Sequence, residues 1–298
     1  MRVNLHVGMH FSRTSRLVRA VRLNEKNFSR YGVKAPPVKG YRTLIKEELA
    51  RLDGLPPTRD EARALVHSIC EESEPRSLVL IEEEWSGAIN DAFKDEMLYA
   101  SIGTNVRQVV ELFQTEDVHL SLALVNPATY IAGVLGVERV VGQAKWFVRN
   151  VDPEKISWRA TIVRLLAEVP DVPITLWAEE DAPLVWARAV RRIADLPDDT
   201  PIRATYLALR EVLTPEGFDR LRTYLAKFPP KTPAARERVI IAFLNKYDAA
   251  PVYGPEGGIE GWDAAALDTI TERYEADIAA LATHPRITVI QPHLATES

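Results

Sequence analysis

Cysteine is nearly absent from the sequence, since Cys70 is the single one among 298 residues. One cysteine cannot form a disulfide within the chain, and no C-x-x-C or EF-hand spacing occurs, so we expect a reducing compartment and no dedicated metal site. Long hydrophobic runs are also missing, and the N-terminus lacks the basic and apolar segments of a secretion signal. These absences predict a cytoplasmic protein that does not insert into a membrane.

A surplus of positive charge is absent as well. The 37 Lys and Arg residues stand against 42 Asp and Glu residues, which gives a formal net charge of −5 and a pI of about 5.8. This balance excludes general electrostatic attraction to nucleic acid or to an anionic membrane surface. A small anionic ligand therefore needs a local site, and the oligomeric state stays open.

Short runs of β-branched and apolar residues alternate with helical patterns along the chain. The gaps between the runs are too wide for hairpins, so we expect parallel strands joined by crossover helices. The predicted fold class is α/β, a three-layer arrangement around a parallel sheet of about five strands, with a mainly helical C-terminal part. We expect one domain over residues 1–298, with residues 195–282 as a helical elaboration within it. The expected strands are at residues 3–7, 78–81, 118–125, 174–177 and 287–290, and the expected helices at 14–27, 41–52, 58–72, 103–113, 183–194, 201–213, 215–228, 233–246 and 262–282.

The stretch VNLHVGMHFSRTSRLVRAV, residues 3–21, has the pattern of a strand, a glycine turn and a helix. Backbone N–H groups in such a turn and in the first helical residues have no partner within the helix, and the helix dipole adds positive charge there. Residues 8–15 therefore predict a cradle for a small anion. The Walker pattern G-x-x-x-x-G-K-[ST] does not fit, because Arg13 follows Gly8 by five positions and no Lys-Ser or Lys-Thr comes next.

The same stretch resembles the opening of bacterial sulfotransferases and sulfotransferase-like proteins, which reads approximately I-G-x-H-K-T-G-T-T between a strand and a helix. The resemblance implies a P-loop NTPase or sulfotransferase-like topology. It also implies a loop that holds the phosphosulfate end of 3′-phosphoadenosine 5′-phosphosulfate. Phe11 stands in the place of the family's lysine, and Arg13 in the place of its second glycine. The positions that agree are Gly8, His10, Ser12, Thr14 and Ser15.

Three further segments extend the resemblance over nearly the whole chain. In LSLALVNPATYIAG, residues 120–133, Asn126 and Pro127 match the family's loop for the donor's 3′-phosphate, but Val125 replaces its arginine. Residues 174–193 resemble the strand that ends in an acidic pair, and residues 270–290 resemble the closing helix. Without the guanidinium, we expect donor affinity to fall by on the order of 10²-fold or more.

Each candidate residue allows a functional and a structural interpretation. Arg13 and Arg16 lie in the first turn of the expected helix, where a cation opposes the dipole unless a carboxylate or a bound anion lies beside it. His10 is either a turn histidine bonded to the backbone or a proton donor near a transferring group. Glu83 lies at the carboxyl end of the second expected strand. There the resemblance suggests a general base toward a hydroxyl or amine, and the alternative is a solvated strand end.

These observations lead to one main hypothesis and two alternatives. The main one is a sulfotransferase-like protein with an altered donor loop, non-catalytic or divergent, that binds a phosphate- or sulfate-bearing ligand such as a 3′-phosphoadenosine 5′-phosphate-like anion. The alternatives are an active transferase with a carbohydrate-like acceptor, and an interaction or self-association protein without a ligand site. The catalytic candidates are Glu83 and His10, and the ligand-binding candidates are Gly8, His10, Ser12, Arg13, Thr14, Ser15, Arg16 and Asn126.

Overall fold

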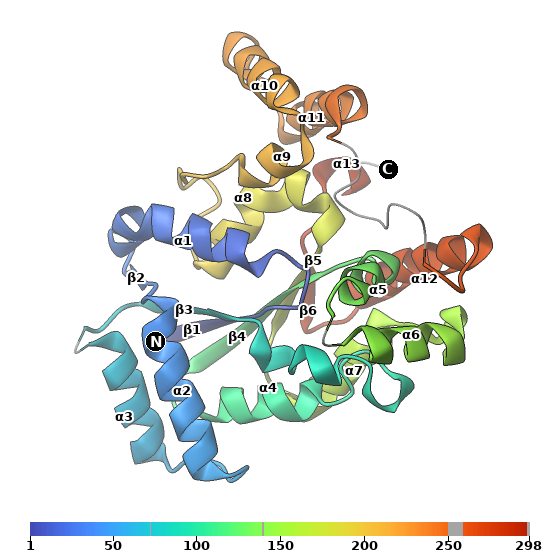
Figure 1. Ribbon diagram of the computed structural model, residues 1–298. Helices are drawn as coiled ribbons and strands as arrows, with labels where there is room; N and C mark the ends of the chain where they lie inside the picture. Colours follow the sequence, from blue (N-terminus) through green and yellow to red (C-terminus); the bar gives the residue numbers. More distant parts are fainter. Residues whose placement is uncertain (72, 139, 250–258, 297–298) are drawn as a thin grey trace.

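The computed structural model describes residues 1–71, 73–138, 140–249 and 259–296. Its centre is a six-stranded, all-parallel sheet in the order β2-β3-β1-β4-β5-β6 (Figure 1). The strands are β1 (Arg2–Val7), β2 (Val33–Lys34), β3 (Ser77–Glu82), β4 (Asp117–Leu124), β5 (Ile174–Ala178) and β6 (Ile287–Val289). The predicted α/β class with a parallel sheet is confirmed. The strand beyond the expected five is β2, whose two residues are too short to give a sequence pattern.

Both faces of the sheet are buried, and the strands show this in their alternation. In β3, Leu78 and Leu80 belong to one hydrophobic cluster, while Val79 and Ile81 belong to the other. Successive strand side chains point to opposite faces, so a strand covered on both sides is a continuous apolar run. This explains why the inner strands were recognisable in the sequence.

Helices cover the two faces unequally. One face packs against α1 (Thr14–Ser29) and α8 (Ala182–Ile193), which supply Leu17, Phe28 and Val185 to that cluster. The helices in the cluster of the other face are α2 (Val38–Leu52), α3 (Arg59–Cys70), α4 (Ile102–Glu111), α5 (Pro127–Leu135), α6 (Val141–Asn150), α7 (Trp158–Glu168) and α12 (Ala264–Ala282).

A third, smaller cluster joins α9 (Leu207–Val212), α10 (Pro215–Lys227) and α11 (Pro233–Tyr247). In Figure 1, α10 and α11 project from the end of the molecule that carries the short C-terminal helix α13 (His293–Thr296). These three helices fall in the segment 195–282, whereas α12 of the same segment packs with the main core. The described helices include none long and apolar enough to cross a bilayer.

The sequence misplaced several helices. It predicted none between 127 and 168, where α5, α6 and α7 lie. Of these, α5 is almost wholly apolar and therefore has little helical periodicity. The helix expected over 201–213 begins only at Leu207, after a series of turns. By contrast, the helix expected over 58–72 is present as α3, and Thr58 and Glu61 form a capping box at its start. The Pro- and Gly-rich composition of residues 250–262 is typical of a mobile surface loop, and residues 250–258 lie outside the described part of the chain.

The close packing of α4 on α7 gives a stability prediction. A methyl group on Gly103 would lie 2.7 Å from Cγ of Glu168 and 2.9 Å from the carbonyl oxygen of Arg164, so G103A must push the helices apart. We expect a loss of about 1–3 kcal/mol in the free energy of unfolding, measured with urea. The control is G142A in α6, where no atom lies within 4 Å of the added methyl, and it should be neutral or slightly stabilising. Equal losses in the two variants would contradict this packing.

Candidate functional site

The carboxyl edge of the sheet near β1 is where an open parallel sheet places its ligand. The chain leaves β1 for α1 on one face, whereas the neighbouring strands β3 and β4 lead to α4 and α5 on the other. Such a divergence opens a crevice beyond the strand ends. Residues 8–13 follow β1 and residues 125–126 follow β4, so the topology brings the two predicted ligand loops to one place.

The loop after β1 has the backbone of an anion cradle in part. Phe11 and Arg13 adopt the left-handed conformation, with φ of 66° and 54°, and Arg13 is an N-cap whose side chain does not cap α1. A left-handed residue followed by a helical one turns successive N–H groups toward one side, which makes a concavity for an anion. Within the described part of the chain, no hydrogen bond engages the N–H groups of Phe11, Thr14 and Ser15.

Other amides of the loop are already bonded. The N–H of Met9 donates to Oγ of Ser12 at 3.2 Å, and the N–H of His10 donates to the hydroxyl of Tyr99 at 3.1 Å. The N–H of Gly8 continues the sheet by donating to the carbonyl of Glu82. The open part of the cradle is therefore its C-terminal half, at the start of α1.

Gly8 allows the loop to approach β3 closely. A Cβ at this position would lie 2.6 Å from Oγ1 of Thr14 and 3.0 Å from both Cα and Cγ of Glu83. The half-buried Glu83 therefore lies against the loop, and its desolvation raises the pKa of its carboxyl, while a hydrogen bond with Thr14 lowers it. The preceding Glu82 is turned elsewhere, to an ion pair with Arg42.

The two first-turn arginines are paired with carboxylates. Nη1 of Arg13 lies 3.0 Å from a carboxylate oxygen of Glu211 in α9. Arg16 is buried, with Nη2 2.7 Å from Glu179 in the 3-10 helix η5 (Glu179–Asp181) and Nε 2.9 Å from the same oxygen of Glu211. The guanidinium of Arg16 also lies over the ring of Trp186 at 5.2 Å. A carboxylate thus stands beside both cations, which is one of the two arrangements that the sequence predicted for first-turn arginines.

His10 and Tyr99 form a stacked pair at the edge of the loop. Their rings lie 5.9 Å apart and nearly parallel, and Nδ1 of His10 is 2.6 Å from the Tyr99 hydroxyl. Burial raises the pKa of Tyr99 to about 12, so its hydroxyl keeps its proton at neutral pH. The Tyr99 hydroxyl accepts from the backbone N–H of His10 and also bonds the His10 ring, so this ring contacts a side chain where the first interpretation expected the backbone.

Phe11 and Val125 make apolar contacts in the structure. Phe11 packs its ring on Gly133 of α5, where an added Cβ would come within 2.7 Å of the ring, and it meets Tyr130 edge to face. Val125 is buried, and its carbonyl accepts from Nε1 of Trp158 at 2.6 Å.

Through its side chain and its backbone N–H, Asn126 makes three hydrogen bonds within the fold. Its Oδ1 accepts from the N–H of Ala128 at 2.9 Å and caps α5, and its Nδ2 donates to Thr271 of α12 at 3.0 Å. Its N–H donates to Glu180 at 2.7 Å, and the same carboxylate accepts from the hydroxyl of Tyr274. Asn126 therefore ties α5, α12 and η5 together at the end of β4.

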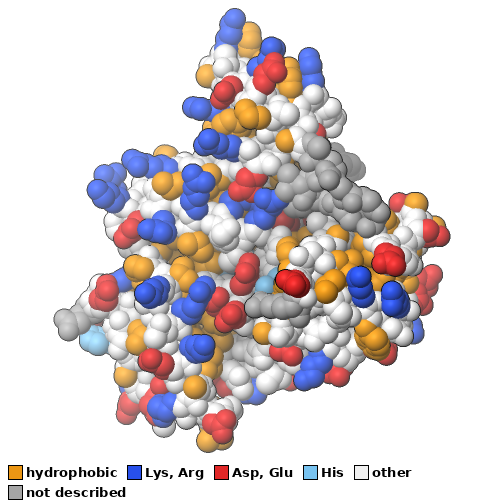
Figure 2. Space-filling view, in the orientation of Figure 1, with side chains coloured by type: hydrophobic (Ala, Val, Ile, Leu, Met, Phe, Trp, Pro, Cys, Tyr) orange, Lys and Arg blue, Asp and Glu red, His pale blue; other side chains and the backbone are white. Residues whose placement is uncertain are grey.

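Sequence reasoning missed Glu211 and Tyr99, the residues that engage Arg13, Arg16 and His10. Glu211 lies 198 positions after Arg13, and Tyr99 lies 89 after His10. No local spacing carries such a pairing. On the face drawn in Figure 2, acidic side chains gather in the middle, between α1 and α5, and basic ones lie over α1. The described residues contain no group of three His, Cys, Asp or Glu that could hold a metal ion.

Comparisons with known proteins give one structural likeness. No protein-family model and no curated protein matches the chain. The chain is similar to the crystal structure of a sulfotransferase from Alicyclobacillus acidocaldarius, with a TM-score of 0.39 and 14% identity, over 80% of this chain and 95% of that one. We base no role of any residue on this likeness.

The buried Glu179 gives a pH prediction. Burial raises the pKa of its carboxyl from 4.5 to about 7, and the ion pair with Arg16 only partly opposes this. Between pH 4.5 and about pH 7, Glu179 is therefore protonated in the folded chain and ionised in the unfolded chain. Through this residue, the free energy of unfolding falls as pH rises across that range. Glutamine does not titrate, so the free energy of unfolding of E179Q minus that of the wild type should rise by about 1–3 kcal/mol from pH 5 to pH 8. Urea unfolding at each pH measures this difference. A difference between the two proteins that does not change with pH would refute this.

Proposed function

We propose that the protein binds a small ligand through a phosphate or sulfate group at the start of α1, and that it does not transfer this group. The observation that carries the proposal is the pair of N–H groups of Thr14 and Ser15, which have no hydrogen-bond partner in the described residues, behind the left-handed N-cap Arg13. Helix N-terminal amides and the helix dipole together favour an anion. Their position at the crevice beyond β1 is where ligands of parallel sheets bind.

The side chains around these amides argue against group transfer. Transfer of a sulfuryl or phosphoryl group needs cations aimed at the charge that develops on it. Here Phe11 is packed on Gly133, and the guanidinium groups of Arg13 and Arg16 are held by Glu211 and Glu179. The sequence motifs that resemble sulfotransferases thus support an inherited binding loop, with residues that do not suit the family's reaction.

The alternative of an active transferase has one observation in its favour. Glu83 lies against Gly8 and Thr14, and burial raises its carboxyl pKa, as a general base near an acceptor requires. In this alternative His10 is the second proton-transfer group. If the wild type turns over 3′-phosphoadenosine 5′-phosphosulfate and E83Q does not, the protein is an active transferase rather than a binding protein.

Removal of Glu211 gives a sharp test of the anion site. Its carboxylate holds Arg13 and Arg16 and repels an anion at the neighbouring amides. We expect E211Q to bind pyrophosphate or 3′-phosphoadenosine 5′-phosphate about two- to fivefold more tightly than the wild type, measured by isothermal titration calorimetry. The control E216Q removes a carboxylate that pairs with Arg220 on the exposed surface of α10, and should not change the affinity.

Nuclear magnetic resonance locates the ligand in the same titration. The amide resonances of Phe11, Thr14 and Ser15 should shift with pyrophosphate and not with uncharged adenosine. Absence of saturable binding by either phosphate compound, or shifts confined to other parts of the chain, would overturn the proposed function.

A further inference from the structure

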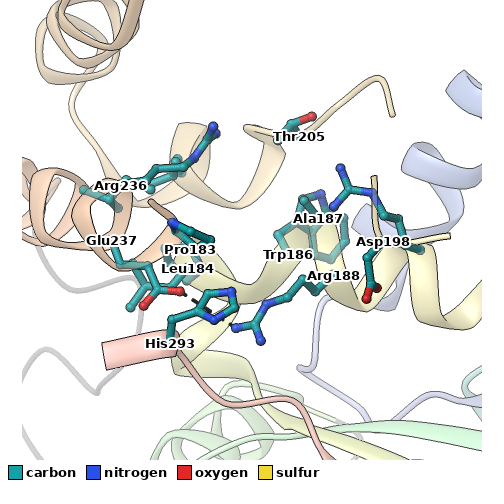
Figure 3. Close-up of a pocket in the computed structure, with 14 residues that line it drawn as sticks. Pro183, Leu184, Trp186, Ala187, Arg188, Asp198, Thr205, Arg236, Glu237 and His293 are labelled. Atoms are coloured by element: carbon teal, nitrogen blue, oxygen red, sulfur yellow. Dashed lines mark ion pairs between the residues drawn. The ribbon is translucent and has the colours of Figure 1, made fainter. Parts of the chain in front are cut away.

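A cavity of about 350 Å³ lies between α8, α9, α11 and α13, outside the loop described above (Figure 3). Its apolar wall includes Pro183, Leu184 and Ala187 of α8 together with Leu209 of α9 and Ile240 of α11. No residue of the loop 8–15 lines it. A hollow of this size, mostly apolar with a few polar groups, is typical of a site for a small molecule.

Charged side chains at one end of the cavity are engaged with each other. Figure 3 shows Arg188 directed toward Glu237 and His293. The guanidinium of Arg188 donates to the carbonyl of Gln291 and lies 3.8 Å from the buried carboxylate of Glu237. The other oxygen of Glu237 accepts from the backbone N–H of Leu294 at 3.0 Å. This end is held by internal bonds.

The other two arginines of the cavity, Arg191 and Arg236, form no ion pair within the described part of the chain. Arg236 extends from α11 with its guanidinium 5.3 Å from the centre of the Tyr206 ring. Nε of Arg191 in α8 donates to the carbonyl of Thr200 at 2.7 Å. Neither arginine forms an ion pair with any described residue within 4.0 Å, although the exposed Asp198 also lines the cavity. Burial is the main cause that lowers the pKa of Arg191, and the positive charge of Arg236 also lowers it, whereas the negative charges of Asp198 and Asp199 raise it.

We propose that this cavity binds a small amphipathic anion, a carboxylate or phosphate group on an alkyl or aromatic body. The anionic group lies between Arg191 and Arg236 and relieves their repulsion, and the apolar body lies against Leu184, Ala187 and Ile240. Guanidinium groups bind both carboxylates and phosphates through paired hydrogen bonds, so the head groups share one chemistry. The proposal does not depend on an anion at the start of α1.

Simple probes separate the two parts of this ligand. Octanoate and octyl phosphate carry the two head groups on one chain, octylamine reverses the charge, and acetate and inorganic phosphate lack the chain. We expect saturable binding of octanoate or octyl phosphate to the full-length protein, measured by isothermal titration calorimetry below the micelle concentration, and no binding of octylamine. The stronger of the two octyl anions identifies the head group. Acetate and inorganic phosphate should bind at least about tenfold more weakly than their octyl counterparts.

Matched variants place the probe in the cavity. R236Q removes the cation and should weaken the better octyl anion at least about tenfold. R192Q removes a neighbouring exposed arginine of α8 that does not line this cavity, and should leave the affinity unchanged. A187W fills the cavity without a change of charge and should abolish binding, with A187M as the milder substitution if the first fails to fold.

Three results would each overturn the site. These are octylamine binding as tightly as octanoate, an affinity in R236Q no lower than in R192Q, and unchanged binding in folded A187W or A187M. Lack of binding by both octyl anions would do the same. Titration with pyrophosphate distinguishes the two sites, because R236Q should leave pyrophosphate binding at the start of α1 intact.

Discussion

The buried guanidinium of Arg16 is the interaction on which the candidate site depends. It joins α1 to η5 through Glu179 and to α9 through Glu211, and its flat face lies on Trp186. An exposed ion pair contributes about 0–1 kcal/mol, but a buried charge left without its partner costs roughly 3–5 kcal/mol. The three segments are therefore held in one arrangement, and the loop after β1 takes its shape from contacts made by residues far along the chain.

This arrangement changes what the start of α1 can offer a ligand. Cations in a first helical turn oppose the dipole, and Glu211 and Glu179 compensate for that within the chain. In the proposed site, an anion is therefore held by backbone N–H groups rather than by the arginines that stand out in the sequence. A site built from amides can hold an anionic group, whereas transfer also requires charge placed on the reacting atoms. This contrast is the physical basis of the proposal that the site binds an anion without transferring it.

Much of the fold was predictable because its signals are local. Strands such as β3 are covered on both faces and form continuous apolar runs, and the capping box of Thr58 and Glu61 marks the start of α3 within four residues. The Gly8 turn between β1 and α1 was recognisable for the same reason. The partners of Arg16, His10 and Asn126 were not, because Glu211, Tyr99 and Thr271 come from distant segments that only tertiary packing brings near. The two-residue β2 and the aperiodic α5 gave too little pattern for either to be identified.

Some arginines of this protein form ion pairs with carboxylates and others do not, and tertiary packing decides which. Arg13 and Arg16 form ion pairs with carboxylates of η5 and α9, which neutralise their charge within the chain. Across Trp186, Arg236 projects from α11 over the Tyr206 ring, and no described carboxylate lies within ion-pair distance of it. The same side chain type thus forms ion pairs next to α1 and none within 4 Å in the cavity beside α8, among the described residues. A count of basic residues cannot separate these cases, since the deciding quantity is whether the folded chain brings a carboxylate within about 4 Å.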